Sequence, residues 1–375
     1  MTGSDRSAHL GGVRHAVVKL GTQLLTDRAA PGRLDQAYLA SIAQQVNELR
    51  GRGCRVTIVS SGAVGCGMGL LKLSARPKDL AQLQAVAAIG QRRLMDAWAD
   101  AFDPLPVAQV LLTRDDIDDR SRFLNLRNTI HAVHALGGVP IINENDTIST
   151  DELVQITFGD NDILAALVCQ ALRAELLVLM TVVDGVLDAS GKPVRLVGRV
   201  EEAEKLLRPE KSALGKGGMN SKLQAARIVT GAGESLVVVD GRTESVLPRL
   251  LAGEQIGTLF APSRAAGDRR GGRSRWIGSA RPAGSIVIDD GAAVAVGQKN
   301  RSLLPAGVMR AEGTFRRGDV VSIVTSSGAI VARGLSNYSS DDVARIARKK
   351  SAEVRTMLGP GAYEEVVHRD NLVVI

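Results

Sequence analysis

Short apolar runs alternate with longer helical patterns between residues 13 and 239, and this alternation limits the fold more than any other feature. The apolar runs predict strands at residues 13–20, 56–59, 107–112, 139–142, 176–180 and 236–239. Apolar residues spaced three and four apart predict helices between them, for example at residues 34–49, 79–102 and 121–136. Strands that alternate with helices indicate an α/β fold, an open and mostly parallel sheet with helices on both faces.

The composition agrees with such a sheet and argues against several other classes of protein. Hydrophobic residues make up 45% of the chain and aromatic residues 3%, so the core is expected to consist of Ala, Val, Leu and Ile. No uninterrupted apolar run reaches the roughly 18 residues of a transmembrane helix. The 3 cysteines are far apart and show no C-x-x-C spacing, which argues against a disulfide framework or a zinc site. We therefore expect a cytoplasmic protein with no membrane partner.

The pattern changes after residue 275, where short glycine-broken strands are predicted at residues 286–288, 294–296, 320–324 and 330–332, followed by a helix at 340–350. Before them, residues 264–275 carry basic side chains, Arg264, Arg269, Arg270, Arg273 and Arg275, against Asp268 alone. We expect an α/β domain at 1–262, a basic Gly/Arg-rich linker at 263–282, a small β-rich domain at 283–361 and a C-terminal tail at 362–375. The linker can contact an acidic partner such as RNA, although a solvated connector is the commoner role of such a run.

Polar clusters directly follow four of the predicted strands. They are residues 19–22, 60–63 and 143–146, together with Thr181. In open α/β sheets, ligands bind beyond the carboxyl ends of the strands. These separate segments therefore predict one binding site at one edge of the sheet.

The segment 215–222 reads Gly-Lys-Gly-Gly-Met-Asn-Ser-Lys and runs straight into a helical pattern. Glycines allow the backbone to approach a ligand closely, and a helix N-terminus and lysines both attract phosphate. The segment is not a Walker A loop, because G-x-x-x-x-G-K-[ST] occurs nowhere in the chain. It predicts a polyphosphate site of another kind; the alternative is an ordinary glycine-rich surface loop.

Together these motifs resemble the glutamate 5-kinases, in order and in spacing. The resemblance is carried by residues 17–22, 60–64, 111–114, 122–125, 141–146, 159–162 and 217–222. The C-terminal part, with residues 284–290, 302–307 and 368–370, is similar to the PUA domain of that family. The resemblance implies an amino-acid-kinase fold and ATP-dependent phosphorylation of the glutamate side-chain carboxylate. The implied product is glutamyl 5-phosphate, the first intermediate toward proline.

The resemblance also implies residues for the phosphate half of the site. Lys19 and Lys222 are expected to contact the phosphates and Asp162 to organise the two lysines; the alternative for Asp162 is a helix N-cap. The implied ATP-binding set is Lys19, Thr181, Val182, Lys216, Gly217, Gly218, Met219, Asn220, Ser221 and Lys222. The family usually has Thr-Asp where this chain has Thr181-Val182, so we expect Val182 to contact the nucleotide through its backbone only. The chemistry implies Mg²⁺, but the sequence identifies no protein ligand for it.

For the glutamate half, the matching positions are Ser61, Asp146 and Asn161, with Asn143 as a weaker candidate. Asp146 can pair with the substrate ammonium, while Ser61 and Asn161 can hydrogen-bond its carboxylates. The alternative for residues 143–146 is a plain turn, in which Asn and Asp are common. A side-chain carboxylate with a pKa of roughly 4.3 is already ionised at neutral pH, so the reaction needs no general base.

The resemblance further implies a homo-oligomer and feedback inhibition by proline. One alternative is a kinase of another small carboxylate on the same fold, such as aspartate, acetylglutamate or carbamate. The residues at 123–125 and the PUA-like part argue against it. Another is an RNA-binding or RNA-modifying protein, suggested by the tail and the linker. The chain lacks the clustered aromatic residues on which bases stack, so a nucleic-acid partner is not expected.

Overall fold

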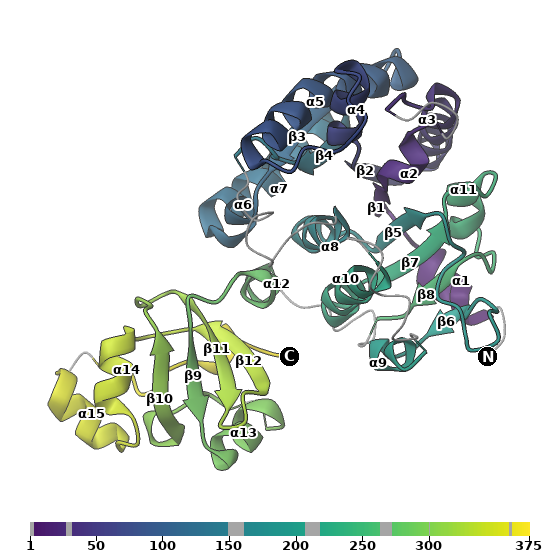
Figure 1. Cartoon of the computed structure of the whole chain (residues 1–375). Coiled ribbons are helices and arrows are strands. Elements are labelled where there is room, and N and C mark those ends of the chain that lie inside the picture. The colour runs from purple at the N-terminus through teal and green to yellow at the C-terminus, as the bar shows by residue number, and fades with distance from the viewer. Residues whose placement is uncertain are drawn as a thin grey trace. The chain divides into compact units, whose positions relative to one another are not determined.

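The computed structural model describes residues 4–27, 32–148, 161–206, 218–262, 272–299, 301–359 and 362–375. The chain forms two compact units, Met1–Arg269 and Arg270–Ile375, whose elements are labelled in Figure 1. Lys216 and Gly217, two of the expected ATP-binding residues, lie outside the described residues.

The first unit is built on an eight-stranded sheet with the order β3-β4-β2-β1-β5-β7-β8-β6. All neighbouring strands are parallel except β7 and β8, which are antiparallel, so the predicted fold class is confirmed. The strands are β1 (His15–Leu20), β2 (Arg55–Ser60), β3 (Val107–Leu112), β4 (Val139–Glu144), β5 (Leu176–Thr181), β6 (Leu196–Val197), β7 (Ser235–Asp240) and β8 (Thr258–Phe260). Because β4, β2, β1 and β5 are adjacent, their carboxyl ends bring the predicted polar clusters to one edge.

Helices cover both faces of this sheet (Figure 1), as the alternating pattern predicts. Those of the first unit are α1 (Ser4–Leu10), α2 (Thr22–Leu25), α3 (Gln36–Gly51), α4 (Ala63–Leu70), α5 (Leu80–Phe102), α6 (Arg114–Asp118), α7 (Arg120–Ala135), α8 (Asn161–Leu172), α9 (Val200–Glu204), α10 (Met219–Gly231) and α11 (Val246–Leu251). Two of the predicted helices begin at aspartate caps: Asp35 accepts the backbone N–H of Tyr38, and Asp79 accepts that of Gln82, each at 2.9 Å.

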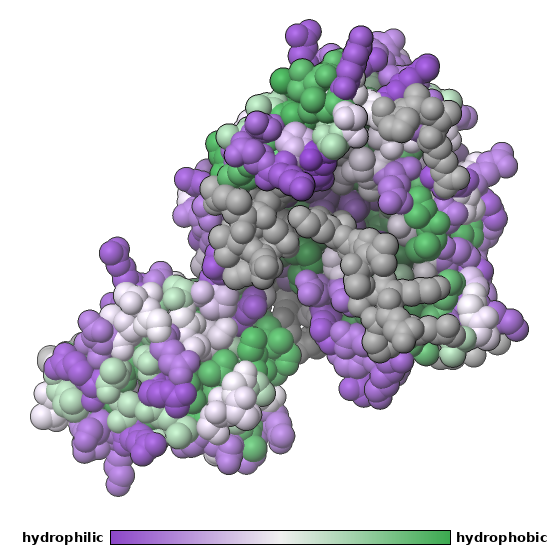
Figure 2. Space-filling view, viewed as in Figure 1, coloured by the Kyte–Doolittle hydropathy of each residue, from purple (hydrophilic) through white to green (hydrophobic). Residues whose placement is uncertain are grey.

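The alternation of side chains along β1 decides which face Lys19 reaches. Val18 and Leu20 belong to the main apolar core, which includes residues of α3, α5 and α11. Since successive strand residues point to opposite faces, Lys19 projects to the other side, where it meets α8. Figure 2 shows hydrophilic residues over much of the visible surface of this unit, in keeping with an apolar core inside it.

The second unit is a five-stranded sheet with the order β10-β9-β11-β12-β13. Its elements are α12 (Gly272–Ser279), β9 (Gly284–Ile288), α13 (Asp290–Gly297), β10 (Val308–Gly313), β11 (Val320–Thr325), β12 (Ile330–Leu335), α14 (Ser340–Ile346), α15 (Ser351–Leu358) and β13 (Leu372–Val374), with short 3-10 turns at Pro305–Gly307 and Arg369–Asn371. This is the β-rich unit that the sequence predicts.

Several details of the second unit differ from the prediction. Residues 294–296 are not a strand but part of α13, because Asp289 caps that helix by accepting the N–H of Ala292 at 2.7 Å. The expected linker contains α12. The expected tail is not separate, because β13 pairs antiparallel with β12 and completes the edge of the sheet. The predicted helix 340–350 ends at residue 346, close to Arg348, whose φ is 62°.

None of the helices in the described ranges is long and apolar enough to cross a membrane.

Candidate active site

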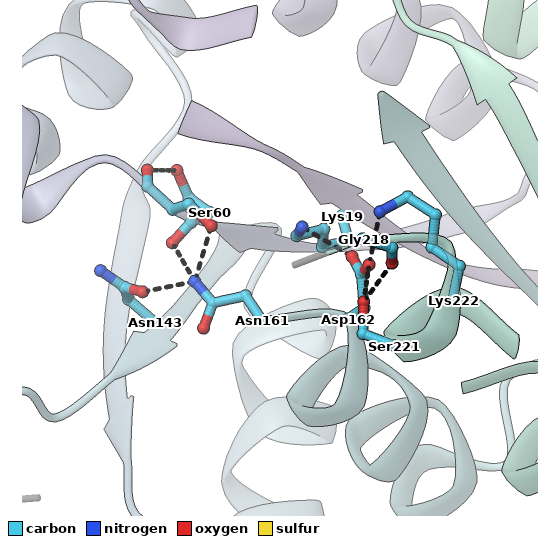
Figure 3. Close-up of polar contacts among 9 residues, drawn as sticks. Lys19, Ser60, Asn143, Asn161, Asp162, Gly218, Ser221 and Lys222 are labelled. Atoms are coloured by element: carbon cyan, nitrogen blue, oxygen red, sulfur yellow. Dashed lines mark hydrogen bonds and ion pairs between the residues drawn. The ribbon is translucent and has the colours of Figure 1, made fainter. Parts of the chain in front are cut away.

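Three charged side chains from distant parts of the sequence meet beyond the end of β1 (Figure 3). Lys19 lies at the end of β1, Asp162 in the first turn of α8 and Lys222 in the first turn of α10. Lys19 Nζ is 2.6 Å from Asp162 Oδ1, and Lys222 Nζ is 2.9 Å from Asp162 Oδ2. The three residues are 5%, 0% and 7% exposed in the order Lys19, Asp162, Lys222. The structure therefore brings together all three residues expected on the phosphate side.

The two ammonium groups determine the charge of Asp162. Burial alone would raise the pKa of this carboxyl, but Lys19 and Lys222 outweigh burial and hold the pKa below its ordinary value. Asp162 is therefore an anion at neutral pH, and the trio of Lys19, Asp162 and Lys222 carries one net positive charge. Both carboxylate oxygens pair with lysines, which is the contact that an organising role requires, and that role stays a prediction.

The start of α10 adds backbone donors beside this trio. Gly218 is the N-cap residue, and Ser221 Oγ donates to its carbonyl oxygen at 2.8 Å and to Asp162 Oδ2 at 3.3 Å. The first N–H groups of any α-helix have no partner within the helix. Here they belong to Met219 and the residues after it, next to Lys222, which is an arrangement that suits a phosphate group.

A second, uncharged cluster lies at the ends of β2 and β4. The side-chain nitrogen Nδ2 of Asn161, the first residue of α8, is 2.8 Å from Ser61 Oγ and 3.0 Å from Asn143 Oδ1. It also lies 3.4 Å from the carbonyl oxygen of Ser60. Ser60 is itself held by Trp98, whose Nε1 donates to Ser60 Oγ at 3.0 Å. Three of the expected glutamate-site residues, Ser61, Asn143 and Asn161, are thus joined by hydrogen bonds.

The polarity of this cluster follows from one backbone group. The N–H of Glu144 can only donate, and it lies 2.9 Å from Asn143 Oδ1, which fixes that atom as the acceptor. Asn161 must then donate to Asn143 Oδ1 through Nδ2, as it also does to Ser61 Oγ. Both hydrogens of Asn161 Nδ2 are used within the protein, and its oxygen Oδ1 points away from the cluster in Figure 3.

This result differs from the expectation that Asn161 hydrogen-bonds a carboxylate of the substrate. A carboxylate needs a donor, whereas the group that Asn161 presents is the acceptor Oδ1. Ser61 Oγ, which accepts from Asn161, keeps its own hydrogen and can donate it. Asn161 is therefore suited to an ammonium group and Ser61 to a carboxylate.

The remaining expected residues lie around the same edge. Asp146 is in the partly exposed turn that follows β4. Thr181 ends β5, and its carbonyl oxygen accepts the N–H of Gly241 at 2.8 Å. Val182 packs against the main apolar core, so its side chain is occupied there. Asp184, which follows Val182 by two positions, binds Arg195 at 2.8 Å.

The described residues show no preformed set of three side chains for a metal ion. Among the described ranges no three His, Cys, Asp or Glu side chains are grouped closely enough to hold one. Asp162, the buried carboxylate nearest the expected phosphates, has both oxygens paired with lysines. We therefore assign no protein ligand to Mg²⁺.

Comparison with known proteins identifies the family. A model of the amino acid kinase family matches residues 14–240, and a model of the PUA domain matches residues 284–358. A glutamate 5-kinase from Stutzerimonas stutzeri (strain A1501) is 44% identical over 98% of this chain and 99% of its own length. The chain belongs to the glutamate 5-kinase family of amino acid kinases.

Other glutamate 5-kinases are similarly related over their whole length. That of Geobacter sulfurreducens is 43% identical over 99% of this chain and 100% of its own. That of Gloeobacter violaceus is 47% identical over 96% of this chain and 99% of its own. A solved carbamate kinase from Giardia lamblia bound to AMP-PNP is more distant, at 16% identity and a TM-score of 0.49 over 67% of this chain and 99% of that chain. The family assignment does not depend on it.

Three further residues shape the site: Trp98 and Gln91, which the sequence patterns did not reveal, and Ser60, which was predicted only as part of the polar cluster 60–63. Gln91 lies on α5, and its Oε1 accepts a hydrogen bond from Asn143 Nδ2 at 2.8 Å. All three are buried. A polar side chain on the apolar face of a predicted helix is a detectable signal, because such a group needs a hydrogen-bonding partner inside the protein.

Proposed function

We infer that this protein transfers the γ-phosphoryl group of ATP to the side-chain carboxylate of L-glutamate. The product is L-glutamyl 5-phosphate, and the reaction opens proline biosynthesis. The observation that carries this inference is the buried trio of Lys19, Asp162 and Lys222 beside the cluster of Ser61, Asn143 and Asn161. The positively charged trio suits a polyphosphate. The neighbouring uncharged cluster, with hydrogen-bond donors and acceptors in fixed positions, suits an amino acid.

The transfer requires no proton movement. The glutamate side chain has a pKa of roughly 4.3 and is ionised at neutral pH, so one of its oxygens attacks the γ-phosphorus directly. The bond from that phosphorus to the bridging oxygen breaks, and ADP leaves with the electron pair. The obstacle is repulsion between two anions, so catalysis consists mainly of positioning and charge neutralisation.

The charged trio supplies the neutralisation. Lys222 is placed to stabilise the transferring phosphoryl group and Lys19 to contact the neighbouring phosphates. Asp162 holds both ammonium groups in position before ATP arrives, so they need not reorganise as charge develops. With two lysines and one aspartate, the trio presents one positive charge to the phosphates.

The uncharged cluster orients glutamate. Asn161 Oδ1 is an acceptor for the substrate ammonium, and Asp146 supplies a negative charge for the same group. Ser61 Oγ donates to a carboxylate. Asn143 acts through Asn161, because its Oδ1 accepts from Asn161 Nδ2.

The nucleotide half is completed by the start of α10 and the end of β5. Gly218, Met219, Asn220 and Ser221 offer backbone groups at a helix N-terminus, in continuation of Lys216 and Gly217. Thr181 and Val182 contact the nucleotide through the backbone, since the Val182 side chain packs on the apolar core. Mg²⁺ is expected to enter bound to the phosphate oxygens of ATP, and no protein ligand is proposed for it.

The test is an assay with ATP, Mg²⁺ and glutamate in the presence of hydroxylamine, which traps an acyl phosphate as a hydroxamate. Glutamate is expected to give the hydroxamate in an ATP-dependent way. Aspartate, acetylglutamate and carbamate serve as matched alternatives. Higher activity with any of these three than with glutamate would overturn the proposal.

We also propose that proline inhibits the enzyme by competing with glutamate, and that the enzyme is a cytoplasmic homo-oligomer. Proline shares the ammonium and α-carboxylate that Asn161, Asp146 and Ser61 are proposed to bind. Asp146→Ala is therefore expected to weaken the binding of both glutamate and proline. Absence of inhibition at millimolar proline would refute the proposed competition, and a monomer in light scattering would refute the oligomer.

A further inference from the structure

Gln91 is a polar residue on the otherwise apolar buried face of α5. It is 8% exposed, and Val86, Ala87, Leu94 and Trp98 on the same helix are at most 4% exposed. Its Oε1 accepts from Asn143 Nδ2 at 2.8 Å. Among the residues that the structure describes, no acceptor lies within reach of Gln91 Nε2, so the hydrogen bond to Asn143 is the polar role of this side chain there.

The hydrogen bond connects Gln91 to the substrate cluster in two steps. Asn143 Nδ2 donates to Gln91, and Asn143 Oδ1 accepts from Asn161 Nδ2 at 3.0 Å. Asn161 Oδ1 is in turn the atom left for the substrate. If the Asn143 amide turned over, its NH₂ group would face Asn161 Nδ2, and two donors would oppose each other. An acceptor at Gln91 therefore helps to fix the direction in which Asn161 presents its oxygen.

The backbone of α5 is held firmly at this point. A Cβ atom placed on Gly90 would lie 1.9 Å from the carbonyl oxygen of Ala63 and 2.3 Å from the N–H nitrogen of Gly67, so no larger residue fits. Ala63 begins α4, directly after Ser61 and Gly62. Consecutive residues of α5 thus contact both sides of the cluster: Gly90 abuts the start of α4, and Gln91 holds Asn143 at the end of β4.

We propose that Gln91 is a positioning residue of the glutamate site, which fixes the Asn143 and Asn161 amides in the direction that binds the substrate. Gln91 does not touch the substrate in this account. Its removal should weaken glutamate binding and leave ATP binding nearly unchanged, because its hydrogen bond goes to Asn143 in the uncharged cluster. The proposal rests on the proposed function, since it assigns Asn161 to glutamate.

The experiment compares Gln91→Met with the wild-type protein in steady-state kinetics. Methionine has a similar length but no strong acceptor, which leaves the buried Asn143 Nδ2 without a partner. A buried donor without a partner is costly, so the Asn143 amide should no longer keep its direction, and the KM for glutamate is expected to rise about tenfold. The KM for ATP should change less than about twofold. Equal changes in both KM values, or no change in either, would overturn the proposal.

The chain offers a matched control in Gln45 on α3. Gln45 is 7% exposed, and its Oε1 accepts the backbone N–H of Leu247 at 3.0 Å, in a part of the core that does not join the site. Gln45→Met should reduce thermal stability by a similar amount and leave the KM for glutamate unchanged. A rise in that KM equal to the rise in Gln91→Met would show that the effect is general destabilisation.

Two further variants keep the proposal testable if Gln91→Met folds poorly. Gln91→Glu restores an acceptor for Asn143 and is expected to recover at least part of the glutamate affinity lost in Gln91→Met. In a double-mutant cycle, Gln91→Met is expected to change the KM for glutamate less than about twofold once Asn143→Ala is present. Full additivity in this cycle would overturn the proposal. Wild-type protein that does not phosphorylate glutamate would instead refute the proposed function itself.

Discussion

Asn161 and Asp162 are neighbours on α8, yet they belong to networks of different kinds. Asp162 joins Lys19 and Lys222 through ion pairs at 2.6 and 2.9 Å. Asn161 joins Ser61 and Asn143 through neutral hydrogen bonds at 2.8 and 3.0 Å. The stability of the charged network depends on the charges of its members. The neutral network instead requires that each amide turn its oxygen or its nitrogen toward the correct neighbour.

The difference teaches how one sheet edge can hold two substrates of different chemistry. A polyphosphate is recognised by net positive charge, and the Coulomb attraction depends little on the orientation of the charged groups. An amino acid carries an ammonium and carboxylates close together, so it is recognised by donors and acceptors in a fixed order. Removal of a charged side chain from the trio should therefore slow the chemical step. A change in the orientation of the Asn161 or Asn143 amide should weaken glutamate binding.

The largest expected effect comes from the charged network. Lys222→Met removes a preorganised positive charge at the transferring phosphoryl group, and kcat should fall at least about 100-fold. Asp162 keeps its ion pair with Lys19, so the protein should still fold, which circular dichroism can check. A near-normal kcat in the folded variant would show that Lys222 takes no part in the reaction.

The next largest effect is expected from a variant that tests whether the neutral network binds glutamate. Asn161→Asp keeps the size of the side chain but replaces the donor Nδ2 by an oxygen, which then faces the acceptor Asn143 Oδ1. The KM for glutamate should rise about tenfold or more, as expected when a buried hydrogen bond is replaced by repulsion. The KM for ATP should stay within about threefold. If glutamate binding were unaffected, the hydrogen bonds of Asn161 would not set the substrate site.

A histidine at the opposite edge of the sheet, where the strands begin, should make the stability of the protein depend on pH. Burial, with His134, Arg55 and His131, lowers the pKa of His15 to about 3. A histidine in the unfolded chain has a pKa near 6.5. The stabilising effect of keeping His15 neutral is thus fully present above about pH 6.5 and is lost as the pH falls toward the folded value.

Between pH 7 and 5 this single group should reduce the free energy of unfolding by on the order of 2 kcal/mol. Urea unfolding of the wild-type protein and of His15→Phe at the two pH values measures the effect. The variant should lose up to about half of the difference between pH 7 and pH 5, because His134, whose pKa is lowered to about 4 chiefly by burial, contributes in the same direction. An identical difference in both proteins would contradict this reading.

The smallest effect is expected from removing the second unit. All the described site residues lie in the first unit, so truncation after Pro262 should keep glutamate kinase activity within about tenfold, or roughly 1.4 kcal/mol of transition-state stabilisation. The soluble truncated protein is assayed beside the full chain. A folded but inactive truncation would show that the second unit completes the site.

The charged network could be predicted from the sequence, and the structure brings its members together. Lys19 lies at the end of an apolar strand, so the rule that ligands bind at the carboxyl ends of strands places it at the predicted site. The parts of Asp162 and Lys222 in that site were predicted from the resemblance to the glutamate 5-kinases. The direction of the Asn161 amide could not be predicted. It depends on the N–H of Glu144, whose position is known only once β4 and α8 are packed.

Gln91 was missed for a related reason. It lies 52 residues from Asn143 and inside a helix, away from the segments after strands where the polar clusters are found. Its position among the buried residues of α5 was the available signal. The error at 294–296 has another origin: a short apolar run fits a strand or a helix equally well, and the cap at Asp289 decides between them.

The division of the site into a phosphate half and a glutamate half is tested most directly by titrating glutamate into two inactive or impaired variants, Lys222→Met and Asn161→Asp, by calorimetry. Lys222→Met is expected to bind glutamate within about threefold of the wild-type affinity, although its kcat falls at least about 100-fold. Asn161→Asp is expected to bind glutamate at least about tenfold more weakly. Equal losses of glutamate affinity in the two variants would contradict the division.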